Sequence, residues 1–152
     1  MLTKGDKAPE VLGMDENGRL LRLSDFAGEK IALYFYPKDM TSGCTAQACS
    51  LRDGYGALMA AGYRVVGVSA DSAASHLRFK AKHELPFPLI ADTDHTLAET
   101  FGVWGEKSMY GRKYMGMFRT TFIIDADTAE IVRVITPKEV KTKIHAEQIL
   151  AE

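Results

Sequence analysis

The chain has 152 residues, of which 46% are hydrophobic and 26% charged, and its formal net charge is −1. A chain of this length usually folds as one domain without structural staples, so we expect a single domain over residues 1–152. The near-zero charge gives no reason to expect a nucleic-acid partner or binding to an anionic membrane. No apolar run approaches the roughly 20 residues of a membrane-spanning helix, and the first residues lack a signal-peptide pattern. A soluble, cytoplasmic protein is therefore expected.

Apolar periodicity predicts strands that alternate with helices. Two short apolar segments on either side of the turn-rich residues 15–18 predict an N-terminal β-hairpin. The continuous apolar run at residues 31–36 predicts a buried central strand. Residues 45–61 then have the pattern of one helix closed by Gly62, and residues 63–70 predict the next strand.

The second half of the chain continues this alternation. Asp71 or Ser72 is expected to cap a helix that ends near His83. A strand weakened by its proline is expected at 87–91, followed by a short helix at 93–101. Together these elements extend the alternating order of the first half.

The last third is less regular. Residues 103–117 contain several glycines and are expected to form a long loop. Residues 120–125 and 131–135 predict a hairpin, and Pro137 is expected to open a final helix. The whole pattern predicts an α/β fold with a central mixed β-sheet flanked by helices on both faces. In such sheets, active sites form where strand ends lead into helix N-termini.

The only two cysteines, Cys44 and Cys49, follow the predicted central strand. Cys44 lies where the chain enters a predicted helix, and the free N–H groups and dipole of a helix N-terminus favour a thiolate. In one regular helix, the Cα atoms of two such residues lie about 8.6 Å apart, whereas a disulfide needs them within roughly 7 Å. The helix would therefore have to unwind whenever the bond formed. This predicts oxidation at one sulfur, followed by a rearrangement that lets the second sulfur attack.

Other interpretations of the cysteine pair remain open at this point. The two thiols could be unrelated small apolar side chains. They could form a dithiol oxidoreductase without peroxidase activity, although the spacing is wider than the C-x-x-C of thioredoxin-type sites. A metal carrier would need further ligands, and the histidines lie on separate predicted elements, at His76, His83, His95 and His145. We expect no metal and no other cofactor.

The residues around the pair resemble a known family. Pro37, Thr41 and Cys44 match the P-x-x-x-T-x-x-C motif of peroxiredoxins. Cys49 resembles the second cysteine of the bacterioferritin-comigratory protein, or peroxiredoxin Q, subgroup. The similarity continues in order along the chain, through residues 35–38, 43–45, 47–49, 51–53, 101–107 and 122–125. Ser42 stands where the subgroup usually has proline, which is expected to loosen the turn without removing a chemical group.

The resemblance implies a thioredoxin-like fold and thiol-dependent peroxide reduction in antioxidant defence. It implies that Cys44 attacks hydrogen peroxide or an organic hydroperoxide and becomes a sulfenic acid. Cys49 then condenses with it to a disulfide, and thioredoxin or a similar dithiol protein restores both thiols. An internal second cysteine removes any need for a partner subunit, so a monomer is expected.

The resemblance also implies roles for nearby residues. The Thr41 hydroxyl would reach the thiolate or the peroxide, although it could instead cap the helix. Pro37 would shield the sulfur from water. Arg119 would favour the thiolate and stabilise charge on the departing oxygen, unless it is a solvated charge. Gly43 is expected to line the pocket. Helical spacing, independently of the resemblance, turns Gln47 toward the same pocket, since it follows the first cysteine by one turn, although it could instead be an exposed polar residue of the helix.

Residues 103–117 offer two further groups with simpler explanations. Four large apolar side chains could form a collar for a larger peroxide or a reductant, but we expect ordinary gap filling. They are Trp104, Met109, Met115 and Met117. The basic side chains of Lys107, Arg112 and Lys113 are expected to form a solvated face.

Overall fold

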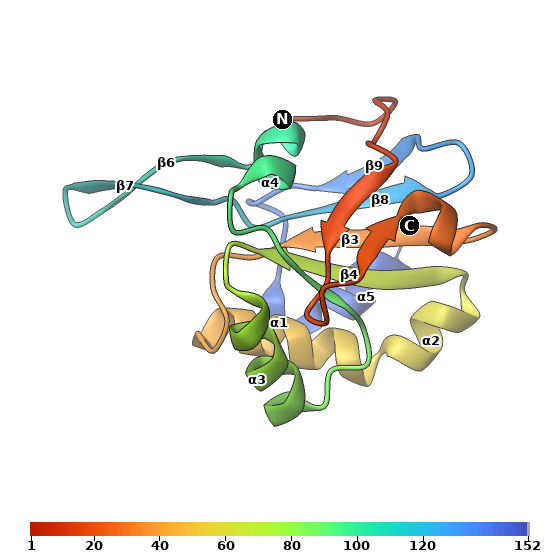
Figure 1. Ribbon diagram of the computed structural model, residues 1–152, viewed down its shortest axis with the longest axis horizontal. Coiled ribbons are helices and arrows are strands. Elements are labelled where there is room, and N and C mark those ends of the chain that lie inside the picture. Colours follow the sequence, from red (N-terminus) through yellow and green to blue (C-terminus); the bar gives the residue numbers. More distant parts are fainter. Residues whose placement is uncertain (152) are drawn as a thin grey trace.

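The structure is a computed structural model that describes residues 1–151. At its centre lies a five-stranded mixed sheet in the order β5-β4-β3-β8-β9 (Figure 1). The middle strand β3 (Lys30–Phe35) pairs parallel with β4 (Tyr63–Ser69) and antiparallel with β8 (Thr120–Asp125). The edge strands are β5 (Leu89–Ala91) and β9 (Ile131–Ile135). The predicted central mixed sheet is confirmed.

Helices cover both faces of this sheet, but unevenly. One face carries four helices, namely α1 (Ser42–Asp53), α2 (Tyr55–Ala60), α3 (Ala73–His83) and α5 (His145–Leu150). The other face is covered by α4 (Thr96–Phe101), the 3₁₀-helix η1 (Leu23–Phe26) and the hairpin of β1 (Val11–Met14) and β2 (Leu20–Arg22). The predicted α/β class and N-terminal hairpin are therefore confirmed.

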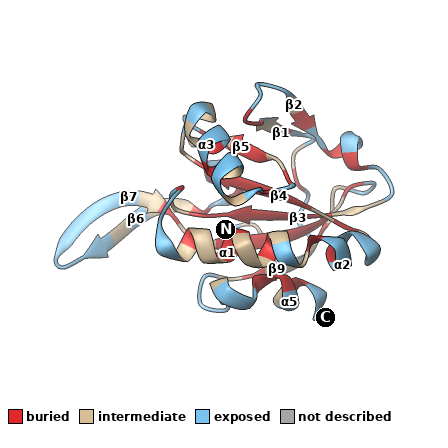
Figure 2. Cartoon of the chain, turned by 90° about the horizontal axis from the view of Figure 1, so that it is seen from below, coloured by how far each residue is buried: buried red, intermediate tan, exposed pale blue. Residues whose placement is uncertain are grey.

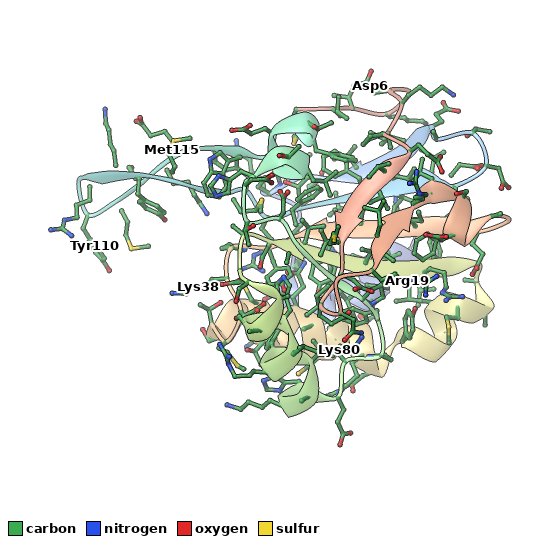
Figure 3. All side chains as sticks on the ribbon, viewed as in Figure 1. Asp6, Arg19, Lys38, Lys80, Tyr110 and Met115 are labelled. Atoms are coloured by element: carbon green, nitrogen blue, oxygen red, sulfur yellow. The ribbon has the colours of Figure 1, made fainter. Side chains whose placement is uncertain are left out.

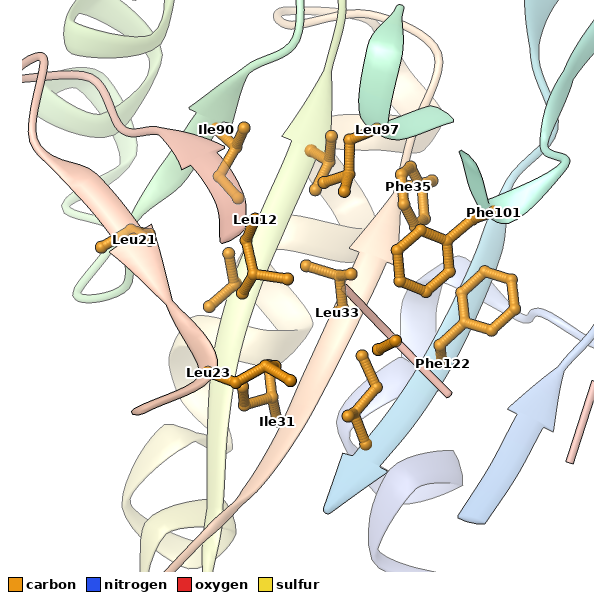
Figure 4. Close-up of a cluster of buried hydrophobic side chains, with 14 of the residues drawn as sticks. Leu12, Leu21, Leu23, Ile31, Leu33, Phe35, Ile90, Leu97, Phe101 and Phe122 are labelled. Carbon is orange, nitrogen blue, oxygen red and sulfur yellow. The ribbon is translucent and has the colours of Figure 1, made fainter. Parts of the chain in front are cut away.

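Both faces of β3 are buried, as its continuous apolar sequence predicts (Figure 2). Successive side chains of a strand point to opposite faces, so Phe35 joins the cluster on one face and Tyr34 the cluster on the other. Phe35, Phe101 and Phe122 pack with ring centroids 4.8–5.8 Å apart (Figure 4). The end of β3 is thus fixed rigidly before the chain turns into α1.

The single helix predicted at 45–61 is wrong in two respects. The chain forms two helices that meet at Gly54, where a Cβ atom would lie 2.6 Å from the Cβ of Ala146 on α5. Glycine allows the close approach of α5 at this point. The first helix also begins earlier than predicted, at Ser42, and Cys44 therefore lies in its first turn.

The loop predicted at 103–117 is wrong, because this segment is a β-hairpin of β6 (Trp104–Met109) and β7 (Arg112–Met117). Its turn residues Tyr110 and Gly111 have φ of 51° and 77°, the positive values that a tight two-residue hairpin turn requires. The hairpin projects from the body of the protein (Figure 1; its tip is labelled in Figure 3). Since most of its side chains are exposed, no apolar alternation marks it in the sequence.

The predicted start of the last helix at Pro137 is also wrong. Backbone N–H and hydroxyl of Thr136 both donate to Glu139 Oε1, over 3.0 and 2.7 Å, which closes a local turn. The 3₁₀-helix η2 (Thr142–Ile144) follows, and α5 begins only at His145. Pro137 therefore lies in a turn rather than at a helix start.

The other predicted elements form close to their expected positions. The Ser72 hydroxyl caps α3 by accepting a hydrogen bond from Ser75 N over 3.2 Å. The strand predicted at 87–91 is shorter and starts after Pro88, and the helix predicted at 93–101 starts at Thr96. Within residues 1–151, no helix is both long enough and apolar enough to cross a membrane.

Candidate active site

Cys44 lies in the first turn of α1, directly after the connection from the end of β3. Its side chain is buried, with 1% of the residue exposed, and its thiol is not in a disulfide. The positive end of the helix dipole favours a negative charge at this position. The fold therefore places a free, buried thiol in the first turn of a helix that follows the central strand.

Arg119 reaches this sulfur from the neighbouring strand. Antiparallel pairing sets Thr120 opposite Phe35, so the residue before Thr120 lies beside the end of β3. From there, Arg119 Nη2 donates to Cys44 Sγ over 3.3 Å, and Nη1 donates to Gln47 Oε1 over 2.6 Å. One guanidinium thus binds the sulfur and the amide one helical turn further on.

Gly43 leaves room for this guanidinium. A Cβ atom at position 43 would lie 3.4 Å from Arg119 Nη2. This is an ordinary van der Waals distance, so a Cβ atom would fit beside the guanidinium, and only a larger side chain would compete with it for space. The structure therefore brings together four of the predicted site residues, namely Gly43, Cys44, Gln47 and Arg119.

Two buried polar groups on the face of the sheet that α1 covers have no hydrogen-bond partner within residues 1–151. They are the Gln47 Nε2 amide and the Tyr34 hydroxyl. Burial raises the pKa of Tyr34 well above its usual value, and the charge of Cys44 raises it further. The hydroxyl therefore stays protonated as a donor. An unpaired buried polar group costs about 1–3 kcal/mol, and the unpaired Gln47 Nε2 belongs to the side chain that shares Arg119 with the sulfur.

Thr41 occupies the N-cap position of α1, but its hydroxyl does not cap the helix. The hydroxyl donates to Lys38 O over 2.9 Å, and the backbone oxygen of Thr41 accepts from Thr45 N over 2.8 Å. Pro37 is half-buried in the same connection. Neither residue shows a hydrogen bond to the sulfur among the described residues, so their roles toward peroxide stay predictions.

A buried network around Asp39 holds this connection in place. Its carboxylate accepts from the Tyr36 hydroxyl (2.6 Å), the Ser75 hydroxyl (2.8 Å) and His76 Nδ1 (2.7 Å). His76 Nε2 lies 3.0 Å from Ile90 O, so both ring nitrogens face an oxygen acceptor. Burial alone would raise the pKa of Asp39, but the bonds from His76 and Tyr36 outweigh it and lower the pKa. No local sequence pattern links these residues, and the prediction missed them.

The same network contains the one group of potential metal ligands found among residues 1–151. Donor atoms of Asp39, Asp71 and His76 lie within 4.8 Å of one another. They already bind protein groups, since Asp71 Oδ2 accepts from Asp39 N over 2.8 Å and from the Ser69 hydroxyl over 2.6 Å. The cluster is therefore explained by the anchoring of the loop without a metal ion.

Lys107 departs from the solvated face that the sequence predicted. Its ammonium donates to Met117 O over 2.8 Å. Burial lowers the pKa of Lys107, the positive charge of Arg119 lowers it further, and Cys44 acts in the opposite direction. Lys107 therefore lies within the electrostatic reach of the site. Arg112 and Lys113 are exposed as expected.

The predicted apolar side chains of the hairpin divide into two groups. Met117 is buried in the core, which agrees with simple gap filling. Met109 and Met115 are each 56% exposed on the projecting hairpin, so they fill no gap within the protein. Trp104 is half-buried and stacks on His95, with ring centroids 3.7 Å apart.

Cys49 lies further along α1, is half-buried and carries a free thiol. Because α1 is continuous from Ser42 to Asp53, the Cα atoms of Cys44 and Cys49 are about 8.6 Å apart by helix geometry. A disulfide cannot span this separation while the helix is intact. A polar neighbour from another helix is His83, whose Nδ1 lies 4.0 Å from the sulfur.

The central strand of a mixed sheet leads into a helix, and the first turn of that helix carries a free thiol bound by an arginine. This combination is typical of a thiol redox protein. The chain belongs to the AhpC/TSA family, which matches residues 4–134. Peroxiredoxin Bcp of Bacillus subtilis is 44% identical over 146 residues, which cover 96% of this chain and 91% of that protein.

Solved structures show the same relationship. The Xylella fastidiosa PrxQ structure superposes with a TM-score of 0.87 at 34% identity, covering 99% of this chain and 94% of that one. The Xanthomonas campestris bacterioferritin comigratory protein has a TM-score of 0.82 at 33% identity, with 96% of both chains covered. The predicted resemblance, the thioredoxin-like fold and the enzyme class are confirmed, because peroxiredoxins are thiol-dependent peroxidases.

Proposed function

We propose that this protein reduces hydrogen peroxide and organic hydroperoxides with Cys44, that Cys49 resolves the oxidised sulfur, and that a dithiol protein recycles the pair. The main support is the contact of Arg119 Nη2 with Cys44 Sγ at 3.3 Å, at the N-terminus of a helix. A guanidinium and a helix dipole at one sulfur both favour the thiolate, which is the form that attacks peroxides.

In the first step, the Cys44 thiolate attacks one peroxide oxygen and the O–O bond breaks. The sulfur keeps that oxygen as a sulfenic acid, and the other oxygen leaves and takes up a proton to give water or an alcohol. Arg119 stabilises the charge that develops on the oxygens. The unpaired Gln47 Nε2 is a second donor for them. The Thr41 hydroxyl orients the peroxide, Pro37 keeps water from the sulfur, and Gly43 leaves space for the guanidinium.

In the second step, Cys49 attacks the sulfenic sulfur of Cys44. A disulfide forms, the S–O bond breaks, and the oxygen leaves as water. Since the two sulfurs cannot bond across an intact α1, the helix unwinds between them.

The third step returns both cysteines to thiols. Thioredoxin or a similar dithiol protein attacks the disulfide and carries the oxidising equivalents away. Among the relatives, the Xanthomonas campestris protein is described by its alkyl peroxide reduction activity, which favours organic hydroperoxides as substrates here too. We propose that the protein acts as a monomer in the cytoplasm, in antioxidant defence.

A stopped-flow experiment with two variants tests this proposal. Reduced wild type, Cys44→Ser and Cys49→Ser are mixed with hydrogen peroxide or tert-butyl hydroperoxide, and peroxide consumption is followed. Cys44→Ser should not react, whereas Cys49→Ser should consume one equivalent and stop at a sulfenic acid that dimedone traps. If Cys44→Ser consumes peroxide as fast as the wild type, the assignment of Cys44 is wrong.

A further inference from the structure

The Cys49 thiol contacts a histidine that the proposed mechanism has not used. His83 is the last residue of α3, and its Nδ1 lies 4.0 Å from Cys49 Sγ. Phe79, one turn earlier on α3, packs against the His83 ring with centroids 5.4 Å apart and planes at 75°. Arg52 on α1 donates to His83 O over 2.8 Å. Phe79 therefore packs on the imidazole, and Arg52 ties the backbone of His83 to α1 beside the sulfur.

Cys49 needs such a neighbour because its position does not favour a thiolate. The attacking sulfur must be ionised, and an ordinary thiol is mostly protonated at neutral pH. Cys49 follows the helix N-terminus by two turns, so the free amides and the dipole that favour the Cys44 thiolate do not help it. A base in contact with the sulfur would remove the proton of the thiol, which the helix N-terminus does not promote at this position.

The other charged or titratable groups near Cys49 cannot act as this base. Tyr34, below α1 on β3, keeps its proton because burial raises its pKa. Arg52, on α1 itself, is a cation with no proton-accepting site, and the charge of Cys49 raises its pKa. Glu84, directly after α3, is exposed and acts on Arg52. Among residues 1–151, His83 is thus the neutral-pH base in contact with the sulfur.

We propose that His83 is the general base for the resolving step, an inference that rests on the proposed function. While α1 is folded, the Cys49 S–H bond breaks and its proton moves to His83 Nδ1. After α1 unwinds between the two cysteines, the thiolate attacks Cys44 Sγ, and the S–S bond forms as the S–O bond breaks. The departing hydroxide takes up a proton from the solvent and leaves as water, and His83 returns its proton to the solvent. The sulfenic sulfur is reduced and Cys49 is oxidised, so no further oxidant is needed.

This assignment predicts how the resolving step depends on pH. With His83 present, the thiolate forms by local proton transfer, and the rate of disulfide formation should level off above the titration of the imidazole. Without His83, Cys49 can lose its proton only to the solvent. The rate of disulfide formation should then rise about tenfold per pH unit until the pH reaches the range in which a free thiol ionises. A histidine that only packs against Cys49 would not change the shape of this profile.

The test compares His83→Gln with Lys82→Gln, which removes an exposed cation from the neighbouring position of the same helix. Each reduced protein is mixed with one equivalent of hydrogen peroxide, quenched at set times, and analysed for dimedone-trapped sulfenic acid and for disulfide by mass spectrometry. At neutral pH, His83→Gln should form sulfenic acid at the wild-type rate but disulfide about 100-fold more slowly. Lys82→Gln should match the wild type in both steps.

A second variant separates base catalysis from misfolding. His83→Ala should also resolve slowly, and added imidazole should restore disulfide formation in it but not accelerate Lys82→Gln. Two results would overturn the role of His83. One is disulfide formation in His83→Gln with the rate and pH profile of the wild type. The other is slow disulfide formation in His83→Ala that added imidazole does not accelerate. Failure of the wild type to form sulfenic acid would instead overturn the proposed function.

Discussion

Replacement of Arg119 by lysine tests whether the guanidinium acts through its charge or through its geometry. In the wild type, Nη2 donates to Cys44 Sγ over 3.3 Å and Nη1 to Gln47 Oε1 over 2.6 Å. Lysine keeps the positive charge, but a single ammonium cannot reproduce this two-armed arrangement. Arg119→Lys therefore separates a directed hydrogen bond from a nearby charge.

The expected size of the effect follows from the bond that is lost. A hydrogen bond to a charged group contributes about 1.5–3 kcal/mol, and a loss of 1.36 kcal/mol corresponds to tenfold in rate. The second-order rate constant of Arg119→Lys with hydrogen peroxide should therefore fall roughly 10- to 160-fold. The rate constant of Arg119→Ala should be lower still, because this substitution removes the positive charge as well.

The assay is stopped-flow peroxide consumption under single-turnover conditions, with the fold checked by circular dichroism. Arg112→Ala is the matched control, because Arg112 is an exposed cation on β7 and should leave the rate unchanged. A wild-type rate in Arg119→Lys would refute the directed hydrogen bond. A wild-type rate in Arg119→Ala would refute any electrostatic role of this residue.

Three further predictions concern positions around the site. Asp39→Asn should lower the free energy of unfolding in urea by about 3–5 kcal/mol, because it leaves His76 without its carboxylate. The pKa of Asp39 is lowered in the folded protein, so the unfolded chain binds a proton at this carboxyl more tightly than the folded protein does. The free energy of unfolding of the wild type should therefore fall as the pH drops below about 4, and that of Asp39→Asn should fall less. Equal pH dependence of the two proteins would contradict this. Gly54→Ala should cost about 1–3 kcal/mol in the same assay, since its Cβ would lie 2.6 Å from Ala146, and an unchanged midpoint would contradict the close approach of α5. Gly43→Ala should keep the rate of peroxide consumption near that of the wild type, because its Cβ would lie at an ordinary van der Waals distance of 3.4 Å from Arg119 Nη2; a large loss of rate would show that the guanidinium needs more space.

The sequence predicts those parts of the fold and site that depend on neighbouring residues. The apolar run before Pro37 marks β3, and the position of Cys44 just after it marks the helix N-terminus. Gln47 follows from helical spacing alone. The placement of Arg119 at the sulfur follows only from the resemblance, because the register of β3 against β8 that brings it there cannot be seen in one sequence.

The remainder depends on contacts between distant segments. Asp39 and His76 meet because α3 packs beside the connection that leads into α1, and no local pattern records this contact. Lys107 lies near the site because it belongs to β6 of the β6–β7 hairpin, and the exposed strands of this hairpin lack apolar alternation. The contact between Cys49 and His83 likewise joins two helices that are separated by a strand in the sequence.

Opening of α1 during turnover is the central claim, and hydrogen exchange measures it most directly. Amide exchange over α1, residues Ser42–Asp53, is compared by mass spectrometry between the reduced protein and the form with the Cys44–Cys49 disulfide. The neighbouring helix α3 serves as the internal reference. Reduced α1 should be protected, and the disulfide form should lose protection in α1 but not in α3. Equal protection of α1 in both forms would contradict the account.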